Sequence, residues 1–321
     1  MILEVQHETR FEYSVPVQDA TIEVRMEPAN NPSQACHTFH LDISPAAEVF
    51  RYQDGLGNRV HHFNILGAYD RMRILAAAVV ETQPPQTNLS ASQAVHPLDH
   101  GDALRDAGLD VLDYLPLRGP VRLTPQLAPV LATLAPQPGM PLAELVVAVG
   151  RYIHDRYEYA RDVTLSSSPI DDLLTHGKGV CQDFTHLMIA VLRSFGVPAR
   201  YVSGYLHREN KQSQSHAWCE VWLPDLGWVG FDPTNDCPAN ERFVKIAIGR
   251  NFSDVPPNKG VYRGRGSESI AVRVETRELE RLPSLTWQEQ LPPLNVPLTA
   301  IVSRNRGTDP DETDSQQQQQ Q

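Results

Sequence analysis

A sequence of 321 residues is long enough for about two domains, and such a chain buries a hydrophobic core without needing disulfide bonds. Hydrophobic residues make up 41% of it and charged residues 21%, which excludes a disordered chain and a small disulfide-held scaffold. The formal net charge of -11 argues against a nucleic-acid-binding surface and against adhesion to anionic lipid. Neither nucleic acid nor membrane is therefore expected as a partner.

The start of the chain does not resemble a secretion signal. Charged residues occur within the first twelve positions, and the longest apolar run, residues 74–80, is too short to span a bilayer. The four cysteines are too few and too scattered for a disulfide framework, and none forms a CxxC pair that would suggest zinc: Cys36, Cys181, Cys219 and Cys237. We therefore expect a cytoplasmic protein with free thiols.

The first 83 residues contain several stretches in which apolar and polar side chains alternate, a pattern typical of strands with one buried face. The clearest covers residues 3–15, and further strands are predicted over residues 21–27, 38–44 and 59–66. Residues 74–82 fit either a buried strand or a short helix. Asp54-Gly55 and Gly57-Asn58 mark turns. We interpret residues 1–83 as an antiparallel β domain.

Residues 84–139 are interpreted as a linker followed by helices. Residues 84–96 are rich in Pro, Gln, Asn and Ser and show little periodicity, which favours a linker. One helix is predicted over residues 102–113. A second is predicted from Thr124 to Leu134, because Thr124 is a suitable N-cap and the next residue is proline.

Residues 140–282 contain helices first and antiparallel strands afterwards, so an α+β domain is predicted there. Apolar spacing indicates helices over residues 140–156, 168–177 and 181–195, and strands over residues 199–206, 216–223, 228–231, 243–248 and 269–275. From residue 283 the chain is proline-rich, then acidic, and it ends in six glutamines. Residues 283–321 are therefore interpreted as a proline-rich segment followed by a disordered tail, because the acidic and glutamine-rich residues 308–321 cannot form a core.

Cys181 is a candidate nucleophile because it starts the strongest predicted helix, directly after Gly177-Lys178-Gly179-Val180. A thiol attacks as its thiolate, and the unpaired N–H groups and dipole of a helix start favour negative charge. The glycines let a substrate approach, and the N–H of Cys181 itself can donate to a developing oxyanion. A buried structural thiol is the competing interpretation.

A histidine and an aspartate on two neighbouring predicted strands supply the remaining groups of a triad. Alternation places His216 on the face opposite Cys219, which we interpret as a small buried hydrophobe. If Leu223 paired with Trp228, Asp232 would point to the wrong face. If Trp222 pairs with Trp228 across a five-residue loop, Asp232 lies diagonal to His216, about 7 Å away by Cα and on the same face. The triad hypothesis therefore predicts a loop of odd length, or a bulge, between the two strands.

Four blocks around these residues resemble the bacterial transglutaminase-like superfamily. They are Gly-Val-Cys-Gln-Asp-Phe (179–184), Gly-Val-Pro-Ala-Arg-Tyr-Val-Ser-Gly-Tyr (196–205), His-Ala-Trp-Cys-Glu-Val (216–221) and Gly-Trp-Val-Gly-Phe-Asp-Pro-Thr-Asn (227–235). The segment from Gly249 to Pro257 and the N-terminal stretch, which is similar to the family's accessory β domain, extend the resemblance to about residue 280.

The resemblance implies a papain-like catalytic core in which Cys181 is the nucleophile, His216 the general base and acid, and Asp232 the residue that orients His216. The implied substrate is a peptide or glutamine-type amide in a peptide or protein, attacked through a thioester that an amine acceptor or water releases. Release to an amine describes a transglutaminase, and release to water a cysteine peptidase or deamidase. No cofactor is expected, and calcium dependence stays open because the spacing of acidic residues is not that of an EF-hand.

Several neighbours are candidates for lining the substrate site, each with a structural alternative. Gln182 and Asp183 line the site or satisfy the first helical turn; Tyr205 and Trp218 contact substrate or pack in the core. No metal site is expected from the remaining histidines and cysteines near Cys36 and His61. A noncatalytic binding module, or a scaffold that recruits partners through the β domain and the glutamine tail, is the competing class of function.

Overall fold

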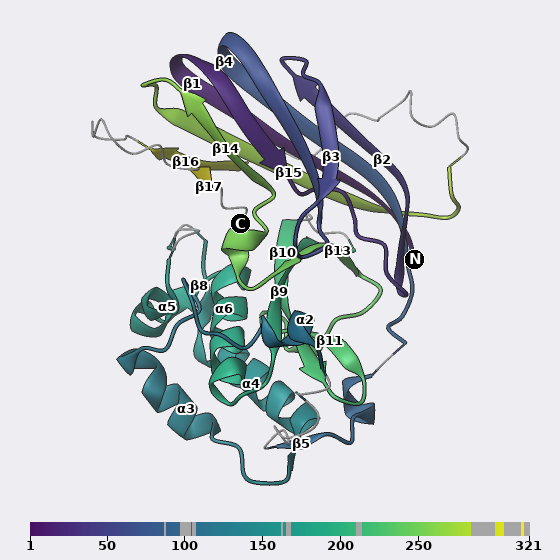
Figure 1. The fold of residues 1–321 in the computed structure, drawn as a ribbon, viewed down its shortest axis with the longest axis vertical. Helices are drawn as coiled ribbons and strands as arrows, with labels where there is room; N and C mark the ends of the chain where they lie inside the picture. The colour runs from purple at the N-terminus through teal and green to yellow at the C-terminus, as the bar shows by residue number, and fades with distance from the viewer. Residues whose placement is uncertain are drawn as a thin grey trace.

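The computed structural model describes residues 1–86, 88–96, 104, 107–161, 163–164, 168–209, 214–283, 299–304 and 316–317. Figure 1 shows two regions: long strands at one end, and helices with a smaller sheet at the other. Within the described residues, no helix is long and apolar enough to cross a membrane.

The N-terminal sheet is built on two long antiparallel strands, β1 (Ile2–Val24) and β4 (Arg59–Thr82). β2 (Gln34–Ser44) and β3 (Val49–Gln53) pair with β4. The predicted strand over residues 21–27 is thus part of β1, and residues 74–82 are strand and not helix. The register of β1 against β4 shifts between Glu12 and Val17 and again between Gln18 and Ala20. Such shifts are typical of β-bulges, which let one long strand change its pairing without ending.

Two strands from the far end of the chain complete this sheet. β14 (Asn258–Arg263) and β15 (Glu268–Leu279) both pair antiparallel with β1, and Ile2 lies opposite Leu279. The strand predicted over residues 269–275 is present as part of β15. Its assignment to the second domain is wrong, because it pairs with β1 of the N-terminal sheet. That sheet therefore includes residues beyond the boundary predicted at residue 83. Alternation shows that a segment is a strand; it does not show which sheet supplies the partner.

Most of the predicted tail lies outside the described residues. Its described parts are β16 (Thr299–Arg304), which pairs with β15, and β17 (Gln316–Gln317), which pairs with β14. A strand edge offers unpaired N–H and C=O groups to any extended segment, whatever its composition. For Gln316–Gln317 the expected disorder is therefore corrected, and the segment before the tail contributes β16 to the sheet.

The helices occupy the middle of the chain, and their ends follow the predicted signals. The Thr124 hydroxyl accepts a hydrogen bond from Leu127 N at 3.3 Å, and Gly177 ends its helix with a φ of 71°. Of the helix predicted over residues 102–113, residues 109–112 form α2. Residues 102–103 and 105–106 lie outside the described residues. The elements in order are η1 (Leu89–Ala91), β5 (Val95–His96), α2 (Leu109–Leu112), η2 (Pro125–Leu127), α3 (Ala128–Leu134), β6 (Met140–Pro141), α4 (Leu142–Arg156), β7 (Glu158–Tyr159), α5 (Ile170–His176), β8 (Lys178–Gly179) and α6 (Cys181–Ser194).

The second sheet has the order β12 (Cys237–Pro238), β11 (Gly227–Asp232), β10 (Gln214–Leu223), β9 (Ala199–Leu206) and β13 (Phe243–Gly249). The short η3 (Phe252–Asp254) follows β13. Leu187 and Val191 of α6 share one core with Ala217, Cys219 and Val221 of β10. Cys219 is fully buried there, as predicted.

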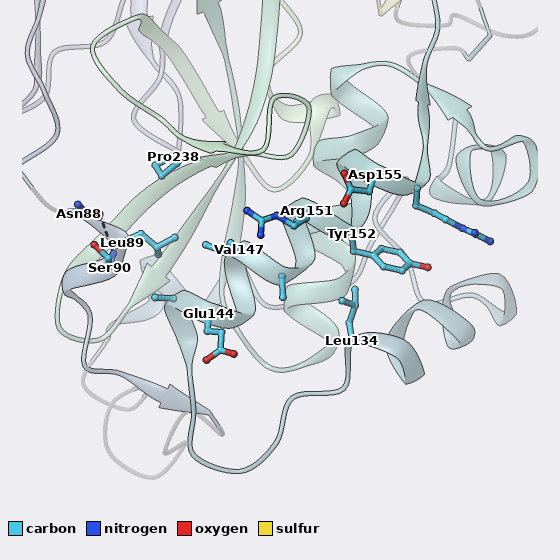
Figure 2. Close-up of a pocket in the computed structure, with 13 residues that line it drawn as sticks. Asn88, Leu89, Ser90, Leu134, Glu144, Val147, Arg151, Tyr152, Asp155 and Pro238 are labelled. Atoms are coloured by element: carbon cyan, nitrogen blue, oxygen red, sulfur yellow. Dashed lines mark hydrogen bonds between the residues drawn. The ribbon is translucent and has the colours of Figure 1, made fainter.

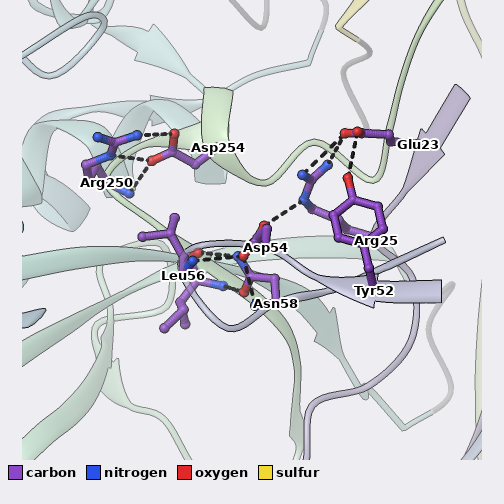
Figure 3. A network of polar contacts seen from close by, with 9 residues as sticks. Glu23, Arg25, Tyr52, Asp54, Leu56, Asn58, Arg250 and Asp254 are labelled. Carbon is purple, nitrogen blue, oxygen red and sulfur yellow. Dashed lines mark hydrogen bonds and ion pairs between the residues drawn. The ribbon is translucent and has the colours of Figure 1, made fainter. Parts of the chain in front are cut away.

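Two amide side chains attach the N-terminal sheet to the outer edge of β13. Asn58 donates to the carbonyl of Ile248 at 2.8 Å and accepts from its N–H at 2.7 Å, and Gln34 does the same with Lys245 at 2.8 and 2.7 Å. Figure 3 shows Asn58 held by Asp54, which also pairs with Arg25. These contacts satisfy backbone groups of an edge strand and connect the two sheets.

Candidate active site

Cys181 is the first residue of α6, and the turn that carries it is held by Asp183. The Asp183 carboxylate accepts from Val180 N at 2.9 Å and from the Thr164 hydroxyl at 2.7 Å. Burial is the main cause that raises the pKa of Asp183, to about 6. Asp183 therefore satisfies the first helical turn, which is the structural alternative considered for it. Gln182 beside it is buried.

The strand register that the triad hypothesis requires is confirmed. Trp222 pairs with Trp228 and Cys219 with Phe231, so the line of pairs places residue 218 opposite 232. His216 Nε2 and Asp232 Oδ2 are 2.7 Å apart, and the Asp232 side chain is fully buried. Asp232 Oδ1 accepts from Thr234 N at 2.8 Å, and its Oδ2 accepts from Asn235 Nδ2 at 2.6 Å. The Asp232 carboxylate thus has three hydrogen-bond partners, one on Oδ1 and two on Oδ2.

The charges of this cluster favour a protonated His216. Burial by itself lowers the pKa of His216, but the charge and hydrogen bond of Asp232, with a hydrogen bond to Cys181, outweigh burial and raise it to about 10. Burial raises the pKa of Asp232, and the His216 cation with the other hydrogen bonds brings it below its ordinary value. Because Nε2 is engaged by Asp232, Nδ1 is the ring nitrogen left for Cys181. The arrangement can hold a thiolate beside an imidazolium.

The other three cysteines have no comparable surroundings. Burial raises the pKa of Cys36 and Cys237 to about 11, and that of Cys219 still further above its ordinary value. None of the three therefore ionises near neutral pH. All four cysteines are free.

Trp218 packs beneath His216 and does not reach solvent. It is 2% exposed, and its ring lies 6.4 Å from that of His216 at an interplanar angle of 23°. Gly204 and Gly230, on the two flanking strands, leave room for the indole, since a Cβ on Gly204 would lie 2.8 Å from Trp218 Cη2 and one on Gly230 3.4 Å from its Nε1. The packing alternative considered for Trp218 is the one that the structure favours.

Tyr205 lies on the face of the sheet opposite His216. It pairs with Ser215, whereas Gly204 pairs with His216, and neighbouring residues of a strand point to opposite faces. Its hydroxyl is 2.7 Å from Nδ1 of the buried His7 in the N-terminal sheet. Tyr205 thus connects the two sheets and is not brought together with the other candidate residues.

Asn235, Tyr159 and Glu220 are residues of this region that the sequence did not single out. Asn235 donates a hydrogen bond to the Asp232 carboxylate. Its position three residues after Asp232, in the Pro-Thr-Asn block, is the sequence feature that could have indicated this contact. Glu220 is buried between Arg200, at 2.7 Å, and Lys245; burial raises its pKa, but these cations lower it to about 2. Burial raises the pKa of Tyr159 to about 12, and the charge of Cys181 contributes to the rise. The pairing of β7 with β8 brings Tyr159 close to Cys181, and no local sequence pattern predicts that pairing.

A separate cavity of about 970 Å³ lies against α4 and does not include the predicted triad among its lining residues. Figure 2 shows Arg151, Tyr152 and Asp155 of α4 along it, with Leu89 and Pro238 on the other side. Arg151 Nε is 3.1 Å from Asp236 Oδ2, and His154 Nδ1 is 3.0 Å from the carbonyl of Thr234. α4 thereby supports the loop that follows Asp232.

Two family profiles match the chain. The profile of the transglutaminase-like superfamily matches residues 132–233, and that of the bacterial transglutaminase-like N-terminal region matches residues 3–81. The first match contains all three residues of the predicted triad, and the second covers β1 to β4.

Known proteins are similar over different shares of their length. An uncharacterized protein of Mycobacterium leprae is 32% identical over 289 residues, which are 86% of this chain and 99% of that protein. A protein-glutamine gamma-glutamyltransferase of Pseudomonas aeruginosa is 29% identical over 179 residues, 50% of this chain and 27% of that protein. The crystal structure of a proposed cysteine protease from Cytophaga hutchinsonii superimposes with a TM-score of 0.72 at 22% identity, covering 88% of this chain and 93% of that one. The last similarity shows the fold, and the predicted α+β core after an antiparallel β region is confirmed.

Proposed function

Since the chain belongs to the transglutaminase-like superfamily, we propose that it is a thiol enzyme that forms an acyl-enzyme from a peptide or glutamine-type amide. The observation that carries the proposal is the 2.7 Å contact of His216 with the buried Asp232, beside a cysteine at a helix start. Cys181 acts as nucleophile, His216 as base and acid, and Asp232 keeps the imidazole oriented and charged. A noncatalytic binding module would not need the buried Asp232 carboxylate and its contact with His216.

The proposed reaction has two steps. The Cys181 thiolate attacks the amide carbon, the C–S bond forms, and the carbonyl oxygen becomes an oxyanion facing the first N–H groups of α6, which have no partners inside the helix. The C–N bond then breaks, and the His216 proton passes to the leaving amine, or to ammonia from a glutamine side chain. Water or a primary amine next attacks the thioester and gives its proton to His216, and the C–S bond breaks to restore the thiolate.

Iodoacetamide at neutral pH, followed by peptide mapping, tests the nucleophile. Preferential labelling of Cys181 is expected, because burial raises the pKa values of the other three cysteines. His216→Ala is expected to remove the preference, and His176→Ala, at an exposed histidine in the last turn of α5, is the matched control that leaves it unchanged. Equal labelling of all four cysteines in the wild type would contradict the proposal.

The choice between transfer and hydrolysis needs a second experiment. The purified protein is incubated with glutamine-containing peptides, with and without a labelled primary amine. Incorporation of the amine supports a transglutaminase, in keeping with the name of the Pseudomonas relative. Release of ammonia or cleaved peptide alone supports a deamidase or peptidase, in keeping with the name of the Cytophaga protein. We further propose a reducing compartment, the cytoplasm, since all four thiols are free.

A further inference from the structure

Arg161 lies at the exposed edge of the site because the backbone before it is fixed beside the nucleophile. β7 pairs parallel with β8 so that Tyr159 lies opposite Gly179, two residues before Cys181, and Ala160 N donates to the carbonyl of Gly179 at 2.9 Å. Tyr159 is 42% exposed, and its ring meets that of Phe184 edge-on at 6.4 Å. Arg161 is exposed and donates to the Tyr159 hydroxyl.

Arg208, two residues after the end of β9, reaches the same edge. Its Nη2 donates to Asn235 Oδ1 at 3.1 Å, and the Nδ2 of that asparagine donates to Asp232 at 2.6 Å. Arg208 is therefore two hydrogen bonds away from the aspartate that holds His216. Its charge also acts on Tyr159, as do those of Cys181 and Arg161. The two arginines thus flank one tyrosine next to the thiol.

Three acidic residues close in sequence to Tyr159, Arg208 and Asn235 each form an ion pair with another cation. Glu158 pairs with Lys178 at 2.9 Å, Glu209 with Arg242 at 2.9 Å, and Asp236 with Arg151 at 3.1 Å. Within the part of the chain that the structure describes, neither Arg161 nor Arg208 forms an ion pair with a carboxylate. Although the chain has a net charge of -11, its described part thus holds two cations without a carboxylate partner beside the proposed nucleophile.

We propose that Arg161 and Arg208 bind a carboxylate of the acyl donor, so that the site prefers amides with an acidic group next to the reacting carbonyl. This inference rests on the proposed function and names its substrate class. A guanidinium presents several donors in a planar fork that matches a carboxylate, and two positive charges at the edge of a site concentrate anionic substrates there. An aspartate or glutamate beside the reacting residue, or a free α-carboxylate, supplies the anion.

Alkylation with a matched pair of reagents tests the subsite without relying on turnover. In both iodoacetate and iodoacetamide the thiolate displaces iodide to form a thioether, but iodoacetate carries a carboxylate. Arg161→Gln and Arg208→Gln are each expected to lower the ratio of the iodoacetate to the iodoacetamide rate at Cys181 about threefold at low ionic strength, and together about tenfold. The change is expected to shrink in high salt.

Two control variants separate the effect of charge from structural effects. Arg265→Gln removes the same charge at an exposed position beside the N-terminal sheet and is expected to leave the ratio unchanged. Arg208→Lys keeps the charge and is expected to keep the ratio, although the contact with Asn235 changes. A loss of rate with both reagents in the Gln variants, or an unchanged ratio in the double variant, would overturn the proposal.

Peptide substrates link the subsite to activity. Arg161→Gln is expected to raise KM several-fold for glutamine peptides with a neighbouring glutamate and to leave KM for those with a neighbouring alanine unchanged. Equal KM values for both peptides in the wild type would overturn the acidic preference. If no peptide reacts while the alkylation ratio still falls, the proposed function fails and the anion subsite stands.

Discussion

Replacing Asp232 with Asn removes the negative charge behind His216 while keeping the size of the side chain. Asp232 Oδ2 accepts from both His216 Nε2 and Asn235 Nδ2, and Oδ1 accepts from Thr234 N. An asparagine that keeps its oxygen toward Thr234 turns its NH₂ group toward His216. The imidazole must then present an unprotonated Nε2, so the imidazolium loses both its counter-charge and its acceptor.

The size of the effect follows from the forces on His216. In the wild type, burial lowers the pKa of His216, and Asp232 and Cys181 together raise it to about 10, compared with an ordinary value of 6.5. Without the carboxylate the pKa of His216 falls, because burial is then opposed by Cys181 alone. An adjacent opposite charge is worth about one to three pKa units, so the ratio of the thiolate–imidazolium pair to the neutral thiol–imidazole pair is expected to fall about a hundredfold.

The rate of iodoacetamide alkylation at Cys181 between pH 5 and 9 measures this change. The wild type is expected to stay reactive down to acidic pH, whereas Asp232→Asn is about a hundredfold slower at pH 6, with a gap that narrows toward pH 9. Asp19→Asn, at a half-exposed residue of the N-terminal sheet paired with Arg263, is the control and keeps the wild-type profile. Superimposable profiles of wild type and Asp232→Asn would refute the role assigned to the carboxylate.

Three further predictions concern stability. Gly204→Ala places a Cβ 2.1 Å from the carbonyl oxygen of Val244 and is expected to cost about 3 kcal/mol or more in urea unfolding, whereas Gly55→Ala, with no atom within 4 Å, changes little; equal losses would contradict the packing argument. Asn58→Ala leaves two backbone groups of β13 unpaired and is expected to cost about 2–3 kcal/mol in the same assay, so a neutral result would show that water replaces the amide. Glu220 is stabilising above its ordinary pKa of 4.5, and this contribution is lost as pH falls from there toward about 2, because Lys245 and Arg200 lower its folded-state pKa against burial. Glu220→Gln should flatten the acid side of the stability curve, and an unchanged slope would speak against the ion pairs.

Much of the candidate site could be predicted from local features of the sequence. The glycines before Cys181 and the apolar spacing after it define a helix start, and the observed α6 begins at that residue. Alternation places His216 and Cys219 on opposite faces, and a triad required a loop of odd length or a bulge between the two strands. The pairing of Trp222 with Trp228 confirms a loop of odd length. These features depend on contacts between residues close in the chain, where period and side-chain type carry the information.

The sequence by itself determined the strand and helix content, the helix start that carries Cys181 and the alternative registers of the His216 strand. The tertiary structure alone decided that β15 completes the N-terminal sheet, that Tyr205 faces His7, and that the charges of Arg161 and Arg208 both act on Tyr159. Such contacts join residues far apart in the chain, Tyr205 and His7 being 198 positions apart. Periodicity assigns a side chain to a face, but the partner on that face is chosen by packing and pairing of the whole chain.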